Sequence, residues 1–181
     1  MTNKSNPYRD LMSERRETTD MLAIFGGFRL GIQGGEHQDR AAVLVCVSLL
    51  EQALEDAIWE RAAHHAQDER EKFFTEGGVA TSLAGKIFLA YVLGVIGPKI
   101  RADLTRVRQV RNIFAHAKRH IDFSNEQVMK MCVFNMADTE LWKRLIGQST
   151  PTPREAFVLA VQLIAEAFIA PGDELRQIML S

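Results

Sequence analysis

The stretch AAVLVCVSLLEQALEDAI, residues 41–58, decides the fold of this chain. Its apolar side chains recur at intervals of four, three, four and four residues. This spacing places them on one face of an α-helix, whereas a half-buried strand would need alternation. We therefore predict a long helix over about residues 36–65 at the centre of a helical bundle. The apolar stripe consists of Val43, Val47, Leu50, Leu54 and Ile58.

The rest of the chain favours the same class of structure. Spacings of three and four recur, and no short β-branched run is flanked by a hairpin turn. We predict an all-α, single-domain bundle of six or seven helices, with the charged stretch 67–78 as a connector. The helix over residues 81–96 is expected to place Tyr91 and Leu93 on its apolar side. The other expected helices cover about residues 9–28, 99–117, 126–136, 139–146 and 153–170.

The length and composition are those of one globular domain. A chain of 181 residues with 46% hydrophobic and 25% charged residues can bury one sizeable core. Residues 1–35 are expected to form a loosely attached N-terminal helix and glycine-rich hinge, and residues 36–181 the bundle domain. The longest apolar run, AAVLVCVSLL, is about half the length of a membrane span, so we expect no membrane insertion.

The net charge and the cysteines limit the class of function. Lys+Arg 22 against Asp+Glu 23 gives a net charge of −1, so no overall basic excess indicates nucleic acid. Cys46 and Cys132 lie in apolar runs without a Cys-x-x-Cys or Cys-His neighbour, and no secretory pattern opens the chain. We predict a cytoplasmic protein with no thiol chemistry and no cofactor.

The helix expected over residues 99–117 carries the most informative polar side chains. On a helical wheel with Ile100 at zero, Arg111 falls at about 20°, inside the buried stripe. A guanidinium stays charged, so an inward arginine needs a carboxylate, a bound phosphate or a subunit interface. Asn112 and His116 share a face, but Arg111 and His116 are about 140° apart. They converge only if the helix bends or ends near Ala115, or if a second subunit completes the site.

The same region is strongly basic. Residues 99–119 hold seven Lys or Arg residues against Asp103 alone, which indicates an anion-binding surface. The central helix is acidic, so the alternative is that the two helices neutralise each other, with Arg111 paired to Glu51 or Glu55. Under that alternative Asn112 and His116 only stabilise the helix end. The candidate binding residues are Arg101, Arg108, Lys118, Arg119, Glu51 and Glu55.

The motif RNIFAH, residues 111–116, resembles the R-polar-x-x-x-H signature of the HEPN superfamily of small helical bundles. The resemblance implies a dimeric, metal-independent endoribonuclease, or an RNA-binding relative, with the three motif residues lining a cleft between subunits. In cleavage, His116 would act as general acid or base and Arg111 would stabilise the charge on the phosphate. Asn112 would orient the 2′-hydroxyl or the histidine.

A broader resemblance covers about residues 43–133. The runs SLLEQALEDAI (48–58), FFTEGGVATSLAGKIFLAYVLGVI (73–96) and IRADLTRVRQVRN (100–112) are similar in order and spacing to the mannitol operon repressor family, whose fold is also all α. That resemblance implies a transcriptional regulator of sugar-alcohol utilisation. The sequence has no helix-turn-helix, zinc-finger or basic-zipper pattern. We therefore expect a non-enzymatic module that acts through a protein partner and not by direct DNA binding.

We expect no metal site. His116 and His120 have the spacing of metal-binding histidine pairs, but Ala117 stands where a zincin has its glutamate. No third ligand is evident beyond Asp122. Both functional hypotheses predict a homodimer, and they differ in requiring a protein partner or an RNA substrate.

Overall fold

The computed structural model describes residues 36–62, 67–75, 78, 80–147, 150–169 and 172–181. Within them every regular element is a helix, eight α-helices and one 3₁₀ helix, which confirms the predicted all-α class. The expected N-terminal helix and hinge in residues 1–35 lie outside the described residues. The elements are α3 (Glu36–Glu60), α4 (Gln67–Phe74), α5 (Leu83–Val92), α6 (Pro98–His116), α7 (Glu126–Met131), η1 (Asn135–Asp138), α8 (Glu140–Ile146), α9 (Pro153–Ile169) and α10 (Asp173–Leu180).

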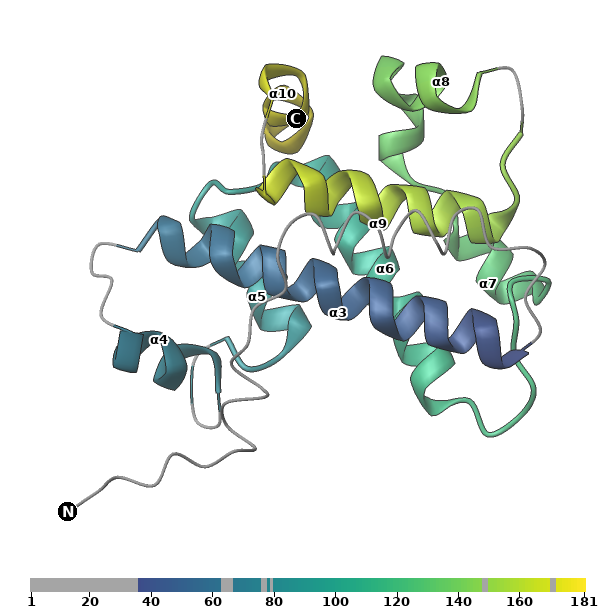
Figure 1. Cartoon of the computed structure of the whole chain (residues 1–181), viewed down its shortest axis with the longest axis horizontal. Helices are drawn as coiled ribbons and strands as arrows, with labels where there is room; N and C mark the ends of the chain where they lie inside the picture. The colour runs from purple at the N-terminus through teal and green to yellow at the C-terminus, as the bar shows by residue number, and fades with distance from the viewer. Residues whose placement is uncertain (1–35, 63–66, 76–77, 79, 148–149, 170–171) are drawn as a thin grey trace.

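Three long helices form the centre of the fold. α3 lies along α9, and α6 packs against both of them, as Figure 1 shows. α3 and α9 begin at the same end of the molecule, where Arg154 Nε donates to Asp39 Oδ1 at 3.0 Å. α5 packs against α3 and α6, and α10 packs against α6 and α9. One side of α6 is thus fixed in the core while the other remains on the surface.

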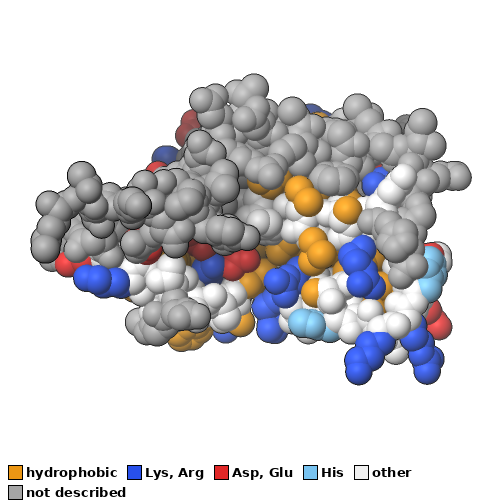
Figure 2. All heavy atoms as spheres, turned by 60° about the horizontal axis from the view of Figure 1, so that its bottom comes forward, with side chains coloured by type: hydrophobic (Ala, Val, Ile, Leu, Met, Phe, Trp, Pro, Cys, Tyr) orange, Lys and Arg blue, Asp and Glu red, His pale blue; other side chains and the backbone are white. Residues whose placement is uncertain are grey.

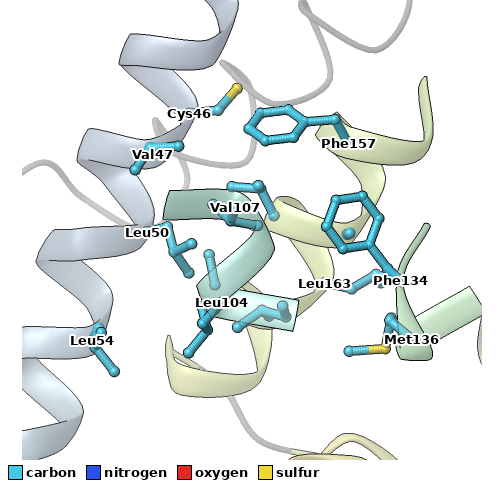
Figure 3. Packing of buried hydrophobic residues seen from close by; sticks show 14 of the residues in the cluster. Cys46, Val47, Leu50, Leu54, Leu104, Val107, Phe134, Met136, Phe157 and Leu163 are labelled. Atoms are coloured by element: carbon cyan, nitrogen blue, oxygen red, sulfur yellow. The ribbon is translucent and has the colours of Figure 1, made fainter. Parts of the chain in front are cut away.

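The apolar stripe of α3 faces this centre, as predicted. Figure 3 shows Leu50 of α3 beside Leu104 and Val107 of α6, with Phe157 of α9 in the same cluster. The ring of Phe157 also lies 5.6 Å from that of Phe123, centroid to centroid. Burial of each such side chain contributes roughly 1.5–3 kcal/mol to folding. The five stripe residues, all at most 1% exposed, are Val43, Val47, Leu50, Leu54 and Ile58.

The stretch expected to be a charged connector contains the helix α4. A charged segment of this length is not stable as an isolated helix, so tertiary contacts must hold it. The rings of Phe73 and Phe74 lie 6.2 and 6.4 Å from that of Trp59, and Arg70 forms an ion pair with Asp56. Two aromatic residues at one end of a charged segment define no apolar stripe, which is why the sequence pattern did not predict the helix.

Three helices also end earlier than predicted, the first being α3, which stops at Glu60 and not at about residue 65. α5 stops at Val92 because Gly94 adopts a left-handed backbone, with φ +67°, that terminates the helix. Tyr91 and Leu93, which were expected on its apolar side, are exposed. α7 stops at Met131, short of the predicted end at residue 136. The last predicted helix ends at about residue 170, and the chain forms one more helix, α10, beyond it.

Candidate functional site

The predicted site residues lie on α6 and on the loop that follows it. Gly97 caps the helix and Pro98 occupies its first turn, a position where the missing backbone N–H has no cost. At the other end, Arg40 Nη2 of α3 donates to the Ala117 carbonyl oxygen at 3.2 Å. This contact satisfies a carbonyl at the helix end, a role that the sequence suggested for His116. The buried stripe of α6 consists of Ile100, Leu104, Val107, Val110 and Phe114.

Arg111 and Asn112 meet on α6, but His116 lies apart from them. Arg111 is half-buried, and its Nη1 donates to Asn112 Oδ1 at 3.3 Å. α6 remains helical through His116, so the separation of about 140° between Arg111 and His116 on the helix persists. The His116 side chain is exposed, and within the described residues no hydrogen bond joins it to either partner. One chain therefore brings two of the three motif residues together.

Glu51 and Glu55 of α3 are neutralised by α5 and not by α6. Lys86 Nζ lies 2.5 Å from Glu51 Oε1 and 2.5 Å from Glu55 Oε1. Burial lowers the pKa of Lys86, but its hydrogen bonds to Glu51 and Glu55 outweigh this effect, and the pKa lies above its usual value. The hypothesis that Arg111 pairs with Glu51 or Glu55 is therefore wrong. Lys86 was missed because it stands in an otherwise uncharged, largely apolar stretch.

Asp103 is the second residue that the sequence did not single out. It is fully buried, and it accepts the backbone N–H groups of Asn135 and Met136 at 2.7 and 2.9 Å. Arg106 Nη1 donates to the same carboxylate at 3.0 Å. Burial raises the pKa of Asp103, while the backbone hydrogen bonds act in the opposite direction. A signal was present, since Asp103 falls within the buried stripe on the helical wheel that located Arg111.

The basic side chains of α6 and its following loop form a surface. We define the α6 basic surface as Arg101, Arg108, Arg111, Lys118 and Arg119, of which Arg101, Lys118 and Arg119 are exposed. Figure 2 shows Lys and Arg side chains on one face of the molecule, among exposed hydrophobic ones. Because Lys86 already neutralises Glu51 and Glu55, these two carboxylates do not neutralise the positive charge of the α6 basic surface. The arrangement is suited to binding an anionic group.

Asp39 forms a further buried polar contact, distant in sequence from its partners. Its Oδ1 accepts from Arg154 Nε at 3.0 Å, and its Oδ2 accepts from the Phe123 backbone N–H at 3.4 Å. Burial raises the pKa of Asp39, opposed by the hydrogen bond from Phe123 and by the charge of Arg154. The contact joins three segments of the bundle, so its role is structural.

Other kinds of site find little support in the described part of the chain. It contains no group of three or more His, Cys, Asp or Glu residues that could hold a metal ion. Burial raises the pKa of the Cys46 and Cys132 thiols to about 12, which leaves no nucleophilic thiolate near neutral pH. No single described helix is long and apolar enough to cross a membrane, and the bent pair α9 and α10 passes that test only when the two are taken together.

Comparisons of the chain with protein-family models, with curated proteins and with solved structures each gave no match.

Proposed function

We propose that this protein is a non-enzymatic, helical regulatory module, similar to the mannitol operon repressors, that acts in the cytoplasm by binding a protein partner. One observation carries the non-enzymatic part of the proposal. α6 is an uninterrupted helix through His116, which leaves the general acid or base of the RNIFAH motif away from Arg111 within one chain. A nuclease site would need both side chains on one reacting phosphate.

The α6 basic surface supports the binding part of the proposal. Arg101, Arg108 and Arg111 lie on a helix whose opposite side is packed in the core, and Lys118 and Arg119 lie in the loop that follows it. Arg106 is bound to Asp103, whereas Lys118 and Arg119 are exposed at the end of the helix. Such a surface attracts an acidic protein, and the sequence has no helix-turn-helix, zinc-finger or basic-zipper pattern for reading DNA.

Transcript levels test the regulatory function. We expect deletion of the gene to raise transcription of a sugar-alcohol utilisation operon, and wild-type protein to restore repression. Arg108→Glu combined with Lys118→Glu should not restore it, while purified wild-type protein should leave the promoter DNA unshifted. Transcript levels that do not change on deletion would contradict the proposal.

An endoribonuclease is the second candidate, favoured by the surroundings of Arg111. Within the described residues, Arg111 contacts Asn112 and forms no ion pair with a carboxylate, so its charge is available to a phosphate. In a homodimer, His116 of a second copy could complete the site. Cleavage of mixed cellular RNA in EDTA, abolished by both Arg111→Ala and His116→Ala in folded protein, would establish this candidate. Unchanged cleavage in the two variants would identify a contaminating nuclease.

A further inference from the structure

The outward face of α5 is apolar. Phe88, Tyr91 and Val92 are 58%, 37% and 61% exposed, and their spacing of three and four places them on one side of the helix. The opposite side is buried and includes Ile87 and Ala90. Scattered exposed apolar residues need no explanation, but a contiguous set on one helix face indicates an interaction surface. We call these three residues the α5 apolar face.

Positive charge borders this face. The Arg101 guanidinium carbon lies 4.5 Å from the centroid of the Tyr91 ring. Arg108 is seven residues after Arg101, about two helical turns, so it lies on the same side of α6. Because α5 packs against α6, the two arginines form a basic edge beside the α5 apolar face.

A groove lies next to Arg101 and extends the surface formed by the α5 apolar face and its basic edge. It is open, has a volume of about 380 Å³, and is formed by the first two turns of α6. Its lining combines small or aliphatic side chains with the guanidinium group of Arg101, whereas that of Arg106 is bound to Asp103, so the groove is suited to a partly apolar, partly acidic ligand. The lining residues are Pro98, Arg101, Ala102, Thr105 and Arg106.

We propose that the α5 apolar face and its basic edge bind an acidic amphipathic helix of a partner protein. An amphipathic helix presents apolar side chains at intervals of three and four residues, which match the spacing on α5. Its flanking carboxylates would pair with Arg101 and Arg108 and extend into the groove. This proposal rests on the proposed function, because it specifies where the regulatory module holds its partner.

The charge and the chemistry of the surface favour this occupant over two others. In a two-fold dimer through this face, both copies would contribute Arg101 and Arg108 to one interface, and the three residues of the α5 apolar face bring no carboxylate to pair with them. Single-stranded RNA binds by stacking bases on exposed rings. Arg101 already covers the Tyr91 ring and Val92 has no ring, so Phe88 is the one uncovered ring of the α5 apolar face, and a run of bases has no second ring there to stack on.

A designed peptide tests the proposal on the full-length protein. The probe is a peptide of about 18 residues, about five helical turns, with leucines on one face and glutamates flanking them. The control peptide has lysine in place of every glutamate. Binding is measured by titration calorimetry, and we expect the glutamate peptide to bind at least about tenfold more tightly than the lysine peptide.

Matched variants locate the binding site. Val92→Ser and Phe88→Ser should each weaken binding of the glutamate peptide by about tenfold, and Arg101→Glu by more than that. Val133→Ser is the apolar control, because Val133 is 65% exposed and lies beyond α7. Lys130→Glu on α7 is the charge control, since it changes the net charge by the same amount. Both controls should bind within about twofold of wild type.

Several outcomes would overturn the proposal. The first is equal affinity for the glutamate and lysine peptides. The second is an equal change in peptide affinity in Val92→Ser and Val133→Ser. The third is a Val92→Ser variant that binds the peptide normally but loses self-association or RNA binding. The peptide titration does not depend on transcription. If the glutamate peptide binds as expected but deletion of the gene leaves transcript levels unchanged, only the regulatory function is rejected. If the peptide does not bind but the protein represses transcription, only this docking site is rejected.

Discussion

Asp103 Oδ2 accepts the backbone N–H of Met136 at 2.9 Å and so fixes the segment after α7 to the middle of α6. The two residues are separated by 33 positions in the sequence, and both are buried. The chain leaves the α7 helix at Met131 and re-enters helical geometry only in η1, whose first two backbone amides donate to this carboxylate. A single acidic side chain thus accepts hydrogen bonds from two amides at the start of η1 that have no intrahelical acceptor.

Removal of this carboxylate should destabilise the bundle. In Asp103→Ala, two backbone N–H groups lose their acceptor, at least one of them in a buried position, and the expected loss is about 2–4 kcal/mol in the free energy of unfolding. Urea denaturation followed by circular dichroism measures it. The control is Asp138→Ala, which removes the same charge from an exposed position of η1 and should change stability by less than about 0.5 kcal/mol. Equal effects of the two variants would show that the Asp103 hydrogen bonds contribute nothing.

Lys86 should stabilise the fold up to alkaline pH. Its pKa in the folded protein lies above its ordinary value of 10.5, so the folded state holds the proton more tightly than the unfolded state. The contribution is therefore complete below about pH 10.5 and is lost as the pH rises through the folded-state pKa. Lys86→Met should lower the free energy of unfolding at neutral pH by about 2–3 kcal/mol, because Glu51 and Glu55 lose their cation.

The pH dependence separates this electrostatic effect from lost packing. The difference in stability between wild type and Lys86→Met should shrink above about pH 10.5, and the triple variant with Glu51→Gln and Glu55→Gln should recover part of it at neutral pH. A difference that stays constant from neutral pH to pH 11 or above would mean that Lys86 acts through its aliphatic stem alone.

Gly97 permits the close approach of α10 to the start of α6. A Cβ atom at this position would lie 2.5 Å from the Leu180 carbonyl oxygen, and the Gly97 N–H donates to the Met179 carbonyl oxygen at 2.6 Å. Gly97→Ala should therefore push α10 away and cost about 1–3 kcal/mol. Gly172→Ala is a matched control, because Gly172 also caps a helix and has open space around its Cα. Thermal melts measure the change in melting temperature of each variant. Equal changes in Gly97→Ala and Gly172→Ala would contradict this explanation.

The two cysteines should be chemically silent in the folded protein. Both thiols are buried with a pKa of about 12, so Ellman's reagent should not react with them at about pH 8. Both should react once the protein is unfolded in guanidinium chloride. Rapid reaction of either thiol in the native state would show that its part of the core opens easily.

The sequence predicted the elements whose stability comes from one continuous apolar stripe. α3 and the inner side of α6 follow the expected periodicity, because burial of one helix face is encoded by residues three and four apart. α4 and α10 were not predicted, since short helices depend on contacts with distant segments. The aromatic pair of α4, for example, packs on Trp59 of α3.

The partners of charged side chains were less predictable than the helices. The acidic side of α3 was recognised, and so was the basic character of α6. The cation between Glu51 and Glu55 comes from α5, however, because α5 is the helix that packs over that part of α3. The spacing of apolar residues shows which face of a helix is buried, but it does not show which other helix packs against that face. The wheel also placed Arg111 fully inside, whereas it is half-buried at the edge of the stripe.

The contact between Asp39, Arg154 and the Phe123 amide has a consequence for how the bundle opens. These groups come from the start of α3, the start of α9 and the loop before α7. Separation of α3 or α9 would leave a buried charge unpaired, and separation of the loop would remove a hydrogen bond from the buried Asp39 carboxylate. Partial opening at this end is therefore costly, and the three segments should unfold together. Hydrogen exchange at the Phe123 amide would then proceed only through global unfolding, at a rate set by the stability of the whole domain.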